Sequence, residues 1–230
     1  MSAGLQAIIF DFDGVIADSE RLHLLAYQQV LAPLNLQLEH ETYYAHYLGY
    51  DDRGAFRTYS RDNGLGWDDG TIERLIAAKS TCYDELTARG EMLFPGAADF
   101  IREAARRVPI AIASGAQTHE IEEVLDRAQL RPLFVTVVGA DQTARSKPSP
   151  DPYLEAFDRL ARATTTPIEP SQTVAIEDSR WGLVSALGAR LRCVGVTNTY
   201  AAAELEPHAE LVVSGLDTLT LEALDALCRT

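Results

Sequence analysis

Three short apolar runs end at polar side chains. The runs, each with the residue that follows it, are 7–10 before Asp11, 109–113 before Ser114, and 173–176 before Glu177. Apolar runs of four or five residues that stop at polar or turn-forming residues are typical of fully buried strands. We therefore predict three buried strands, each of which ends at a side chain able to take part in chemistry.

The pattern from residue 94 onward alternates between helical and extended segments. The predicted helices are 97–106, 118–128 and 152–162, and the predicted strands are 109–113, 134–138, 173–176 and 191–196. Such alternation favours parallel strands joined by right-handed helical crossovers. We expect an α/β fold with a parallel sheet, whose polar strand ends meet at one edge.

Residues 18–90 have a different character, without a convincing strand. The predicted helices in this stretch are 22–31, 40–48, 53–61 and 71–89, separated by turn-forming residues such as Asn35 and Asn63-Gly64. This pattern predicts a helical domain inserted after the first strand. The predicted boundaries assign residues 1–17 and 91–230 to the α/β core and 18–90 to the helical domain.

Composition and charge narrow the class of protein. With 230 residues, 47% of them hydrophobic, the chain is long enough for one large and one small domain. Its net charge of −14 argues against binding to nucleic acid or to anionic membranes. It has no leader-like N-terminus and no apolar run near the ~20 residues that span a bilayer. We expect a cytoplasmic monomer or weak dimer, with its three cysteines reduced.

Paired carboxylates stand at two of the predicted strand ends. Asp11 and Asp13 are one residue apart, Glu177 and Asp178 are adjacent, and Lys147 lies between the second and last of the three runs. A parallel sheet would bring a hydroxyl, an ammonium group and several carboxylates around one point. That combination suits a phosphoryl group held with a divalent cation.

Four motifs along the chain support a family assignment. They are Asp11-Phe12-Asp13-Gly14-Val15, Ala113-Ser114-Gly115, Lys147-Pro148-Ser149-Pro150-Asp151-Pro152-Tyr153, and Ile176-Glu177-Asp178-Ser179 followed by Gly182. Their order and spacing resemble the phosphatase and phosphomutase branch of the haloacid dehalogenase superfamily, over nearly the whole chain. The resemblance implies a phosphoric monoester hydrolase with a doubly wound, Rossmann-like core and a small α-helical cap that closes over the active site.

The two carboxylates of the first motif receive different roles. Asp11 is the expected nucleophile, because an aspartyl-phosphate divides one difficult hydrolysis into two easier displacements. Asp13 is the expected acid and base, which protonates the leaving oxygen and later activates water.

The remaining core motifs supply groups that bind the phosphoryl oxygens. Lys147 is expected to hold the nucleophile and these oxygens together, and Ser114 to donate a hydrogen bond to them. Gly14 and Gly115 would let backbone N–H groups approach the phosphate closely.

Mg²⁺ is the expected cofactor, since it prefers oxygen ligands in octahedral geometry. The expected ligands are the Asp11 carboxylate, the Asp13 backbone carbonyl and the Asp178 carboxylate, with Glu177 as a supporting or water-mediated partner. Mg²⁺ and Lys147 together balance the three negative charges of Asp11, Asp13 and Asp178.

His23, Arg53 and Lys79 are the candidate substrate-binding residues of the cap. His23 lies in a stretch that resembles the Asp-Ser/Thr-x-x-x-His sequence common to phosphatases and mutases of this branch, and a structural role is the alternative. Arg53, in a predicted loop at 49–53, and Lys79, on the last cap helix, are candidates to bind a second anionic group. For Lys79 a surface salt bridge is the alternative, and it is favoured over substrate binding.

The motifs are compatible with two activities, that of a phosphatase and that of a phosphomutase. β-Phosphoglucomutase-like enzymes typically follow the serine of the second motif with Ser, Lys and Asn, where this chain has Ala116, Gln117 and Thr118. The missing lysine favours hydrolysis of a small phosphorylated metabolite, such as a sugar phosphate, over the phosphomutase alternative. A catalytically silent binding protein is least favoured, because every expected catalytic residue is present.

Overall fold

The computed structural model describes residues 4–47, 50, 52–88 and 92–229. The chain divides into two compact units, which we call the core unit (1–18 and 92–230) and the helical unit (19–91). These boundaries lie one residue from the predicted ones. Among the described residues, none of the helices combines the length and the apolar character needed to cross a bilayer.

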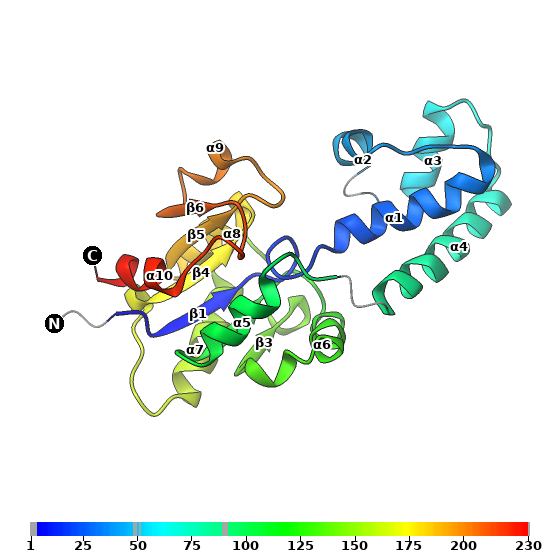
Figure 1. Ribbon diagram of the computed structural model, residues 1–230. Coiled ribbons are helices and arrows are strands. Elements are labelled where there is room, and N and C mark those ends of the chain that lie inside the picture. Colours follow the sequence, from blue (N-terminus) through cyan, green and yellow to red (C-terminus); the bar gives the residue numbers. More distant parts are fainter. Residues whose placement is uncertain (1–3, 48–49, 51, 89–91, 230) are drawn as a thin grey trace. The chain divides into compact units, whose positions relative to one another are not determined.

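The core unit is built on a parallel sheet of six strands in its described part (Figure 1). The strands are β1 (Ala7–Phe10), β2 (Ile110–Ala113), β3 (Thr136–Val138), β4 (Thr173–Glu177), β5 (Arg192–Val196) and β6 (Leu211–Val213). Their order is β3-β2-β1-β4-β5-β6, and every neighbouring pair is parallel. This is the doubly wound order with its switch point between β1 and β4, so the predicted fold class is confirmed.

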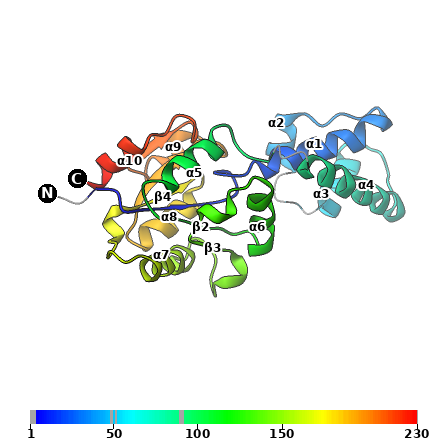
Figure 2. The same cartoon turned by 60° about the horizontal axis from the view of Figure 1, so that its bottom comes forward.

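Helices cover both faces of this sheet. They are α5 (Ala97–Ala105), α6 (Thr118–Arg127), α7 (Asp151–Ala163), α8 (Arg180–Gly188), α9 (Ala202–Leu205) and α10 (Leu221–Cys228), with 3₁₀ turns η2 (Arg131–Leu133), η3 (Ala140–Gln142) and η4 (Pro170–Gln172). Figure 2 shows α5 and α10 on one side of the sheet and α7 on the other.

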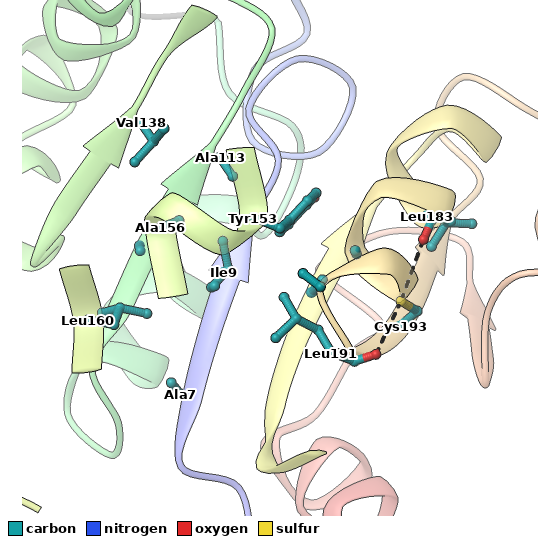
Figure 3. Close-up of a cluster of buried hydrophobic side chains, with 14 of the residues drawn as sticks. Ala7, Ile9, Ala113, Val138, Tyr153, Ala156, Leu160, Leu183, Leu191 and Cys193 are labelled. Carbon is teal, nitrogen blue, oxygen red and sulfur yellow. Dashed lines mark hydrogen bonds between the residues drawn. The ribbon is translucent and has the colours of Figure 1, made fainter. Parts of the chain in front are cut away.

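Alternate residues of β1 pack on opposite faces of the sheet, as the pleat of a strand requires. Ile9 belongs to a cluster with Tyr153 and Leu160 of α7 and Leu183 of α8 (Figure 3). Phe10 points to the other face, where its ring packs edge-on against that of Phe100, with 6.1 Å between the ring centroids. Because both faces of β1 are buried, its sequence is an uninterrupted apolar run.

The helical unit contains α1 (Ser19–Leu31), η1 (Ala32–Leu34), α2 (His40–His46), α3 (Asp52–Asp62) and α4 (Asp69–Ala88). It has its own hydrophobic core, in which Tyr27, Tyr43, Phe56 and Tyr59 are buried. Arg53 lies on α3, as the predicted helix at 53–61 indicated, and its alternative assignment to a loop at 49–53 was wrong. Leu48, Gly49, Asp51 and Arg89, which entered the predicted segments, lie outside the described residues.

The backbone on either side of the helical unit's sequence is paired within the core unit. The Asp18 N–H donates to the carbonyl of Met92 (2.7 Å), and the Phe94 N–H donates to that of Ile16 (3.0 Å). Ala17 and Leu93 form an antiparallel bridge between these two bonds. The chain therefore leaves and rejoins the core unit at adjacent points.

Candidate active site

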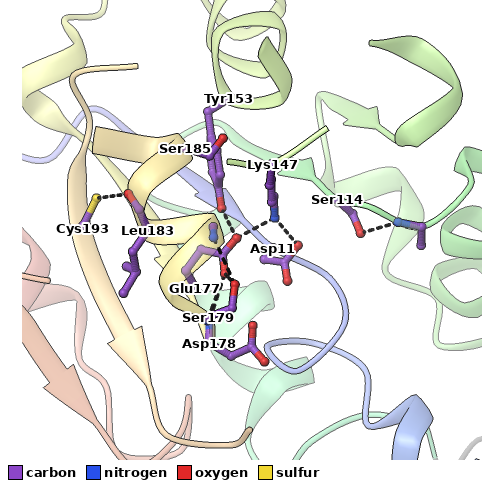
Figure 4. Close-up of polar contacts among 12 residues, drawn as sticks. Asp11, Ser114, Lys147, Tyr153, Glu177, Asp178, Ser179, Leu183, Ser185 and Cys193 are labelled. Atoms are coloured by element: carbon purple, nitrogen blue, oxygen red, sulfur yellow. Dashed lines mark hydrogen bonds and ion pairs between the residues drawn. The ribbon is translucent and has the colours of Figure 1, made fainter. Parts of the chain in front are cut away.

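The carboxyl ends of β1 and β4 bring three acidic side chains together (Figure 4). Phe10 pairs with Ile176, so Asp11 follows β1 at the level where Glu177 ends β4. The Asp11 N–H donates to the Ile176 carbonyl (2.9 Å) and continues the ladder into the site. Carboxylate oxygens of Asp11, Glu177 and Asp178 lie within 4.8 Å of one another, and all three residues are buried.

Lys147 joins two of these carboxylates, although it lies far from both in the sequence. Its Nζ donates to Oδ1 of Asp11 (2.6 Å) and to Oε1 of Glu177 (2.5 Å). Burial lowers the pKa of Lys147, but the charges of Asp11 and Glu177 outweigh burial and raise it above its ordinary value. Lys147 therefore stays protonated and holds Asp11 in place.

Glu177 is fully buried and accepts hydrogen bonds at both oxygens. Oε1 accepts from Lys147 and from the Tyr153 hydroxyl (3.0 Å). Oε2 accepts from the N–H groups of Asp178 and Ser179 and from the Ser179 hydroxyl. Because protein donors already occupy both oxygens, Glu177 is better suited to orienting Lys147 than to direct metal binding.

The pKa values of Asp11 and Asp178 are both raised by their position in this cluster. Burial and the neighbouring Glu177 raise the pKa of Asp178 to about 7, against the hydrogen bond from Thr199 and the charge of Lys147. Burial and Glu177 also raise the pKa of Asp11 well above its usual range, while Lys147 opposes the shift. The described carboxylates outnumber the lysine, and their hard oxygen donors fit a divalent cation such as Mg²⁺.

Asp13 and Gly14 lie in the turn that follows Asp11. Asp13 is half-buried, and its side chain does not belong to the three-carboxylate cluster. Gly14 has a φ of 79°, and a Cβ there would lie 1.9 Å from Oδ2 of Asp178. Both the backbone conformation and the close approach of Asp178 therefore require glycine at this position.

Ser114 and Gly115 follow β2, the strand beside β1. Ser114 is buried, and its hydroxyl accepts a hydrogen bond from the Ala116 N–H (3.1 Å), which leaves the hydroxyl proton available to donate. Gly115 lacks a positive φ, and a Cβ there would meet no atom within 4 Å. Neither strain nor crowding among the described residues demands glycine at 115.

The three predicted cap residues have partners inside the helical unit. The buried Lys79 contacts Nδ1 of His23 (2.7 Å) and Oδ1 of Asp52 (2.7 Å). Burial, followed by the charge of Lys79, lowers the pKa of His23 to about 4, against the charge of Asp52. Arg53 forms an ion pair with Glu73. The contact of His23, Arg53 and Lys79 with substrate stays a prediction. Lys79 does form a salt bridge, but its side chain is buried, so the surface salt bridge favoured from the sequence was wrong.

The site also contains residues that the sequence did not single out. The Tyr153 hydroxyl binds Glu177, and Ser179 caps α8 while it binds Glu177. Asn198 donates to the Gly14 carbonyl, and Thr199 donates to Asp178. Asn198 and Thr199 follow β5, so the signal that located Asp11 and Asp178 was present for them as well.

The fold and the site together define an α/β protein whose candidate active site is a cluster of buried carboxylates around a lysine at the switch point of a parallel sheet. A family model described as haloacid dehalogenase-like hydrolase matches residues 8–196. The chain belongs to this family, as its motifs predicted.

Similar proteins support the assignment along the whole chain. Protein CbbY of Cereibacter sphaeroides is 32% identical over 93% of this chain and 97% of its own. Hexitol phosphatase B of Escherichia coli (strain K12) is 30% identical over 95% of this chain and 96% of its own. The crystal structure of a putative β-phosphoglucomutase from Thermotoga maritima has a TM-score of 0.75 and 25% identity, over 97% of this chain and 98% of that one.

Proposed function

We propose that this protein is a Mg²⁺-dependent phosphatase that hydrolyses a small phosphomonoester, a sugar phosphate or similar metabolite, through an aspartyl-phosphate at Asp11. The observation that carries the proposal is the position of Lys147, whose ammonium group binds both Asp11 and Glu177 beside Asp178. This arrangement supports Asp11 as the nucleophile, because it holds the carboxylate in one position next to a positive charge at the edge of the sheet.

The first step of the proposed reaction is transfer of the phosphoryl group to Asp11. A carboxylate oxygen of Asp11 forms a bond to phosphorus while the bond from phosphorus to the ester oxygen breaks. Asp13 gives its proton to the departing oxygen, so the product leaves as an alcohol. Asp13 is left as a carboxylate, ready for the second step.

The second step is hydrolysis of the aspartyl-phosphate. Asp13 takes a proton from a water molecule, whose oxygen attacks phosphorus as the bond to Asp11 breaks. Inorganic phosphate leaves, and both aspartates return to their starting states. Lys147 and Ser114 hold the phosphoryl oxygens in both steps. Mg²⁺, held by Asp11, the Asp13 carbonyl and Asp178, would neutralise negative charge on the phosphoryl group.

The surroundings of the second motif favour a phosphatase over a phosphomutase. The Gln117 N–H donates to Glu120, and both the N–H and the hydroxyl of Thr118 donate to Asp141. A second phosphate at this turn would therefore meet two carboxylates and donors that are already engaged. This supports a substrate with a single phosphate. We propose further that the helical unit acts as the cap and carries the residues that select this substrate.

The test is phosphate release from a panel that includes fructose 1-phosphate, a hexitol phosphate, xylulose 1,5-bisphosphate, phosphoglycolate and nucleotides. The panel follows the names of similar proteins, among them CbbY, crystallised with xylulose-(1,5)-bisphosphate, and the fructose-1-phosphate phosphatase YqaB. We expect release from a monophosphate that requires Mg²⁺ and is lost in Asp11→Asn.

A parallel assay covers the alternative. Formation of glucose 6-phosphate from β-glucose 1-phosphate with a bisphosphate primer, without phosphate release from any compound, would make the protein a phosphomutase. Release that persists undiminished in Asp11→Asn would rule out the aspartyl-phosphate.

A further inference from the structure

A turn at residues 197–200 closes the active site from the side of β5. β5 pairs with β4 so that Gly195 lies opposite Glu177, and the chain therefore leaves β5 close to Asp178. Asn198 Nδ2 then donates to the Gly14 carbonyl (2.8 Å), and the Thr199 hydroxyl donates to the Asp178 carboxylate. Two consecutive side chains thus bind two different parts of the site, the Gly14 turn and the Asp178 carboxylate.

Gly14, Asp178 and Thr199 lie close to one another. A Cβ built on Gly14 would lie 1.9 Å from Oδ2 of Asp178 and 2.8 Å from Oγ1 of Thr199. The Asp178 carboxylate and the Thr199 hydroxyl therefore both lie against the backbone of Gly14. Asn198 fixes that backbone, because its amide anchors the carbonyl of Gly14 itself.

Each carboxylate of the cluster has its own means of orientation. Asp11 is held by Lys147, and Glu177 is held by Lys147, Tyr153 and Ser179. The Asp178 carboxylate accepts a hydrogen bond from the hydroxyl of Thr199. A carboxylate turns easily about its last side-chain bond, so a donor on one oxygen selects the direction of the other.

We propose that Thr199 is a positioning residue that orients Asp178 for metal binding, with Asn198 holding the Gly14 turn against it. The proposal rests on the proposed function in one respect only, namely that Asp178 is a ligand of Mg²⁺. Partners that orient metal ligands are worth roughly 10–100-fold in metal affinity. Thr199 would act on the metal only through Asp178 and would not contact the substrate.

The experiment is calorimetric titration of Mg²⁺ into the substrate-free protein. Thr199→Val keeps the shape of the side chain and removes its hydroxyl, Thr199→Ser keeps the hydroxyl, and Asp178→Asn marks the loss of a ligand. Thr197→Val is the matched control, since Thr197 lies in the same turn and uses its backbone N–H to bind Val213. We expect the Kd for Mg²⁺ to rise about tenfold or more in Thr199→Val and to stay within about twofold of wild type in Thr199→Ser and Thr197→Val.

Kinetics supply the second readout. For Thr199→Val the Mg²⁺ concentration at half-maximal activity should rise in step with the Kd, while kcat at saturating Mg²⁺ changes less than about threefold. Melting temperatures of both Thr199 variants identify any general loss of folding.

Three results would overturn the inference. They are an unchanged Kd in a folded Thr199→Val, a failure of Thr199→Ser to restore affinity, and wild-type protein that does not bind Mg²⁺. The titration contains no substrate, so it tests this inference separately from the proposed function. If the protein had no phosphatase activity but its Mg²⁺ affinity still depended on the Thr199 hydroxyl, the proposed function would be contradicted and this inference would stand.

Discussion

Lys147 is the residue whose removal should change both activity and stability. In Lys147→Met the buried Asp11 and Glu177 lose their counter-charge. We expect activity to fall by at least about 100-fold, because the donor to the transferred group is lost. Without Mg²⁺, the free energy of unfolding should fall by about 3–5 kcal/mol, as measured by urea denaturation in EDTA.

Two further variants separate charge from packing. Lys147→Met combined with Glu177→Gln should regain part of the stability and none of the activity, because the double variant buries one charge fewer. Arg145→Met removes an exposed partner of Asp151 and should leave the urea midpoint nearly unchanged. Equal losses in Lys147→Met and Arg145→Met would contradict the account of the buried pair.

His23 should make the stability of the protein depend on pH. Its pKa is lowered to about 4, whereas an unfolded histidine has a pKa near 6.5, so between these values the unfolded chain binds more protons. Stability from the neutral imidazole is therefore present above about pH 6.5 and is lost as the pH falls towards 4. Urea denaturation between pH 7 and 4.5 should show a loss about 1–2 kcal/mol larger in wild type than in His23→Gln.

The control for His23→Gln is His119→Gln, on the exposed side of α6. It should follow the wild-type pH dependence throughout. The raised pKa values of Asp11 and Asp178 act equally in all three proteins and cancel in the comparison. Parallel curves for wild type and His23→Gln would show that the imidazole does not titrate in this window.

At the residue scale, the charged side chains at strand ends stood out in the sequence, whereas of the neutral ones Ser114 was singled out and Asn198 and Thr199 were not. Asp11 and Asp178 stood out because each belongs to a pair of carboxylates at the end of a predicted strand and to one of four motifs in a recognisable order. Thr199 and Asn198 occupy a similar place after β5, but threonine and asparagine are ordinary turn residues. Their importance depends on their distance from Asp178 and Gly14, which only the folded chain determines.

The turn after β1 gives a prediction at the scale of the element. Gly14→Ala would place a Cβ against Asp178 and force an alanine to a φ of 79°. We expect a stability loss of about 1–3 kcal/mol from the strained backbone, together with weaker Mg²⁺ binding because Asp178 is displaced. Differential scanning calorimetry with and without Mg²⁺ measures both effects.

Gly115→Ala is the matched control, because a Cβ at 115 meets open space. Its melting temperature should equal that of wild type or exceed it slightly, since alanine restricts the unfolded chain. A loss in Gly115→Ala as large as that in Gly14→Ala would mean that the two turns differ less than their geometry indicates.

Strands that are buried on both faces were predicted, whereas several shorter or less clearly patterned elements were missed. The predicted strand at 173–176 corresponds to β4, which is buried along its whole length. α8 was not predicted, and its exposed side carries Trp181, Val184 and Leu187, so no polar stripe marks its outer face. β6 has only three residues, all half-buried at the edge of the sheet, and was also missed.

At the scale of the molecule, the two separate cores predict two regions of independent stability. Phe56 is buried in the helical unit and Phe100 in the core unit. Phe56→Ala should cost about 3–5 kcal/mol and weaken hydrogen-exchange protection within residues 19–88. Phe100→Ala should weaken protection in the sheet instead. Uniform loss over the whole chain in either variant would mean that the two units unfold as one.

The fold class followed from the sequence because alternating helices and strands permit few arrangements. The order of the strands was not predicted, since it depends on which edge each crossover joins. The arrangement of acidic groups at the switch point then follows from the register of β1 and β4, which sets Asp11 beside Glu177.

Because Ala17 pairs with Leu93, the two ends of the helical unit lie next to each other in the core unit. The helical unit is therefore connected to the sheet in the same way as a long loop between two neighbouring points. An insert whose two ends lie side by side can be lengthened, rebuilt or exchanged without altering the order of the strands that flank it. Under the proposed function, variation in the helical unit would therefore change which substrate is selected, while the proposed chemistry at Asp11 would stay the same. A chimera in which the aligned segment of hexitol phosphatase B replaces residues 19–91 should fold on the same core and, if the helical unit acts as proposed, take its substrate preference from the donor.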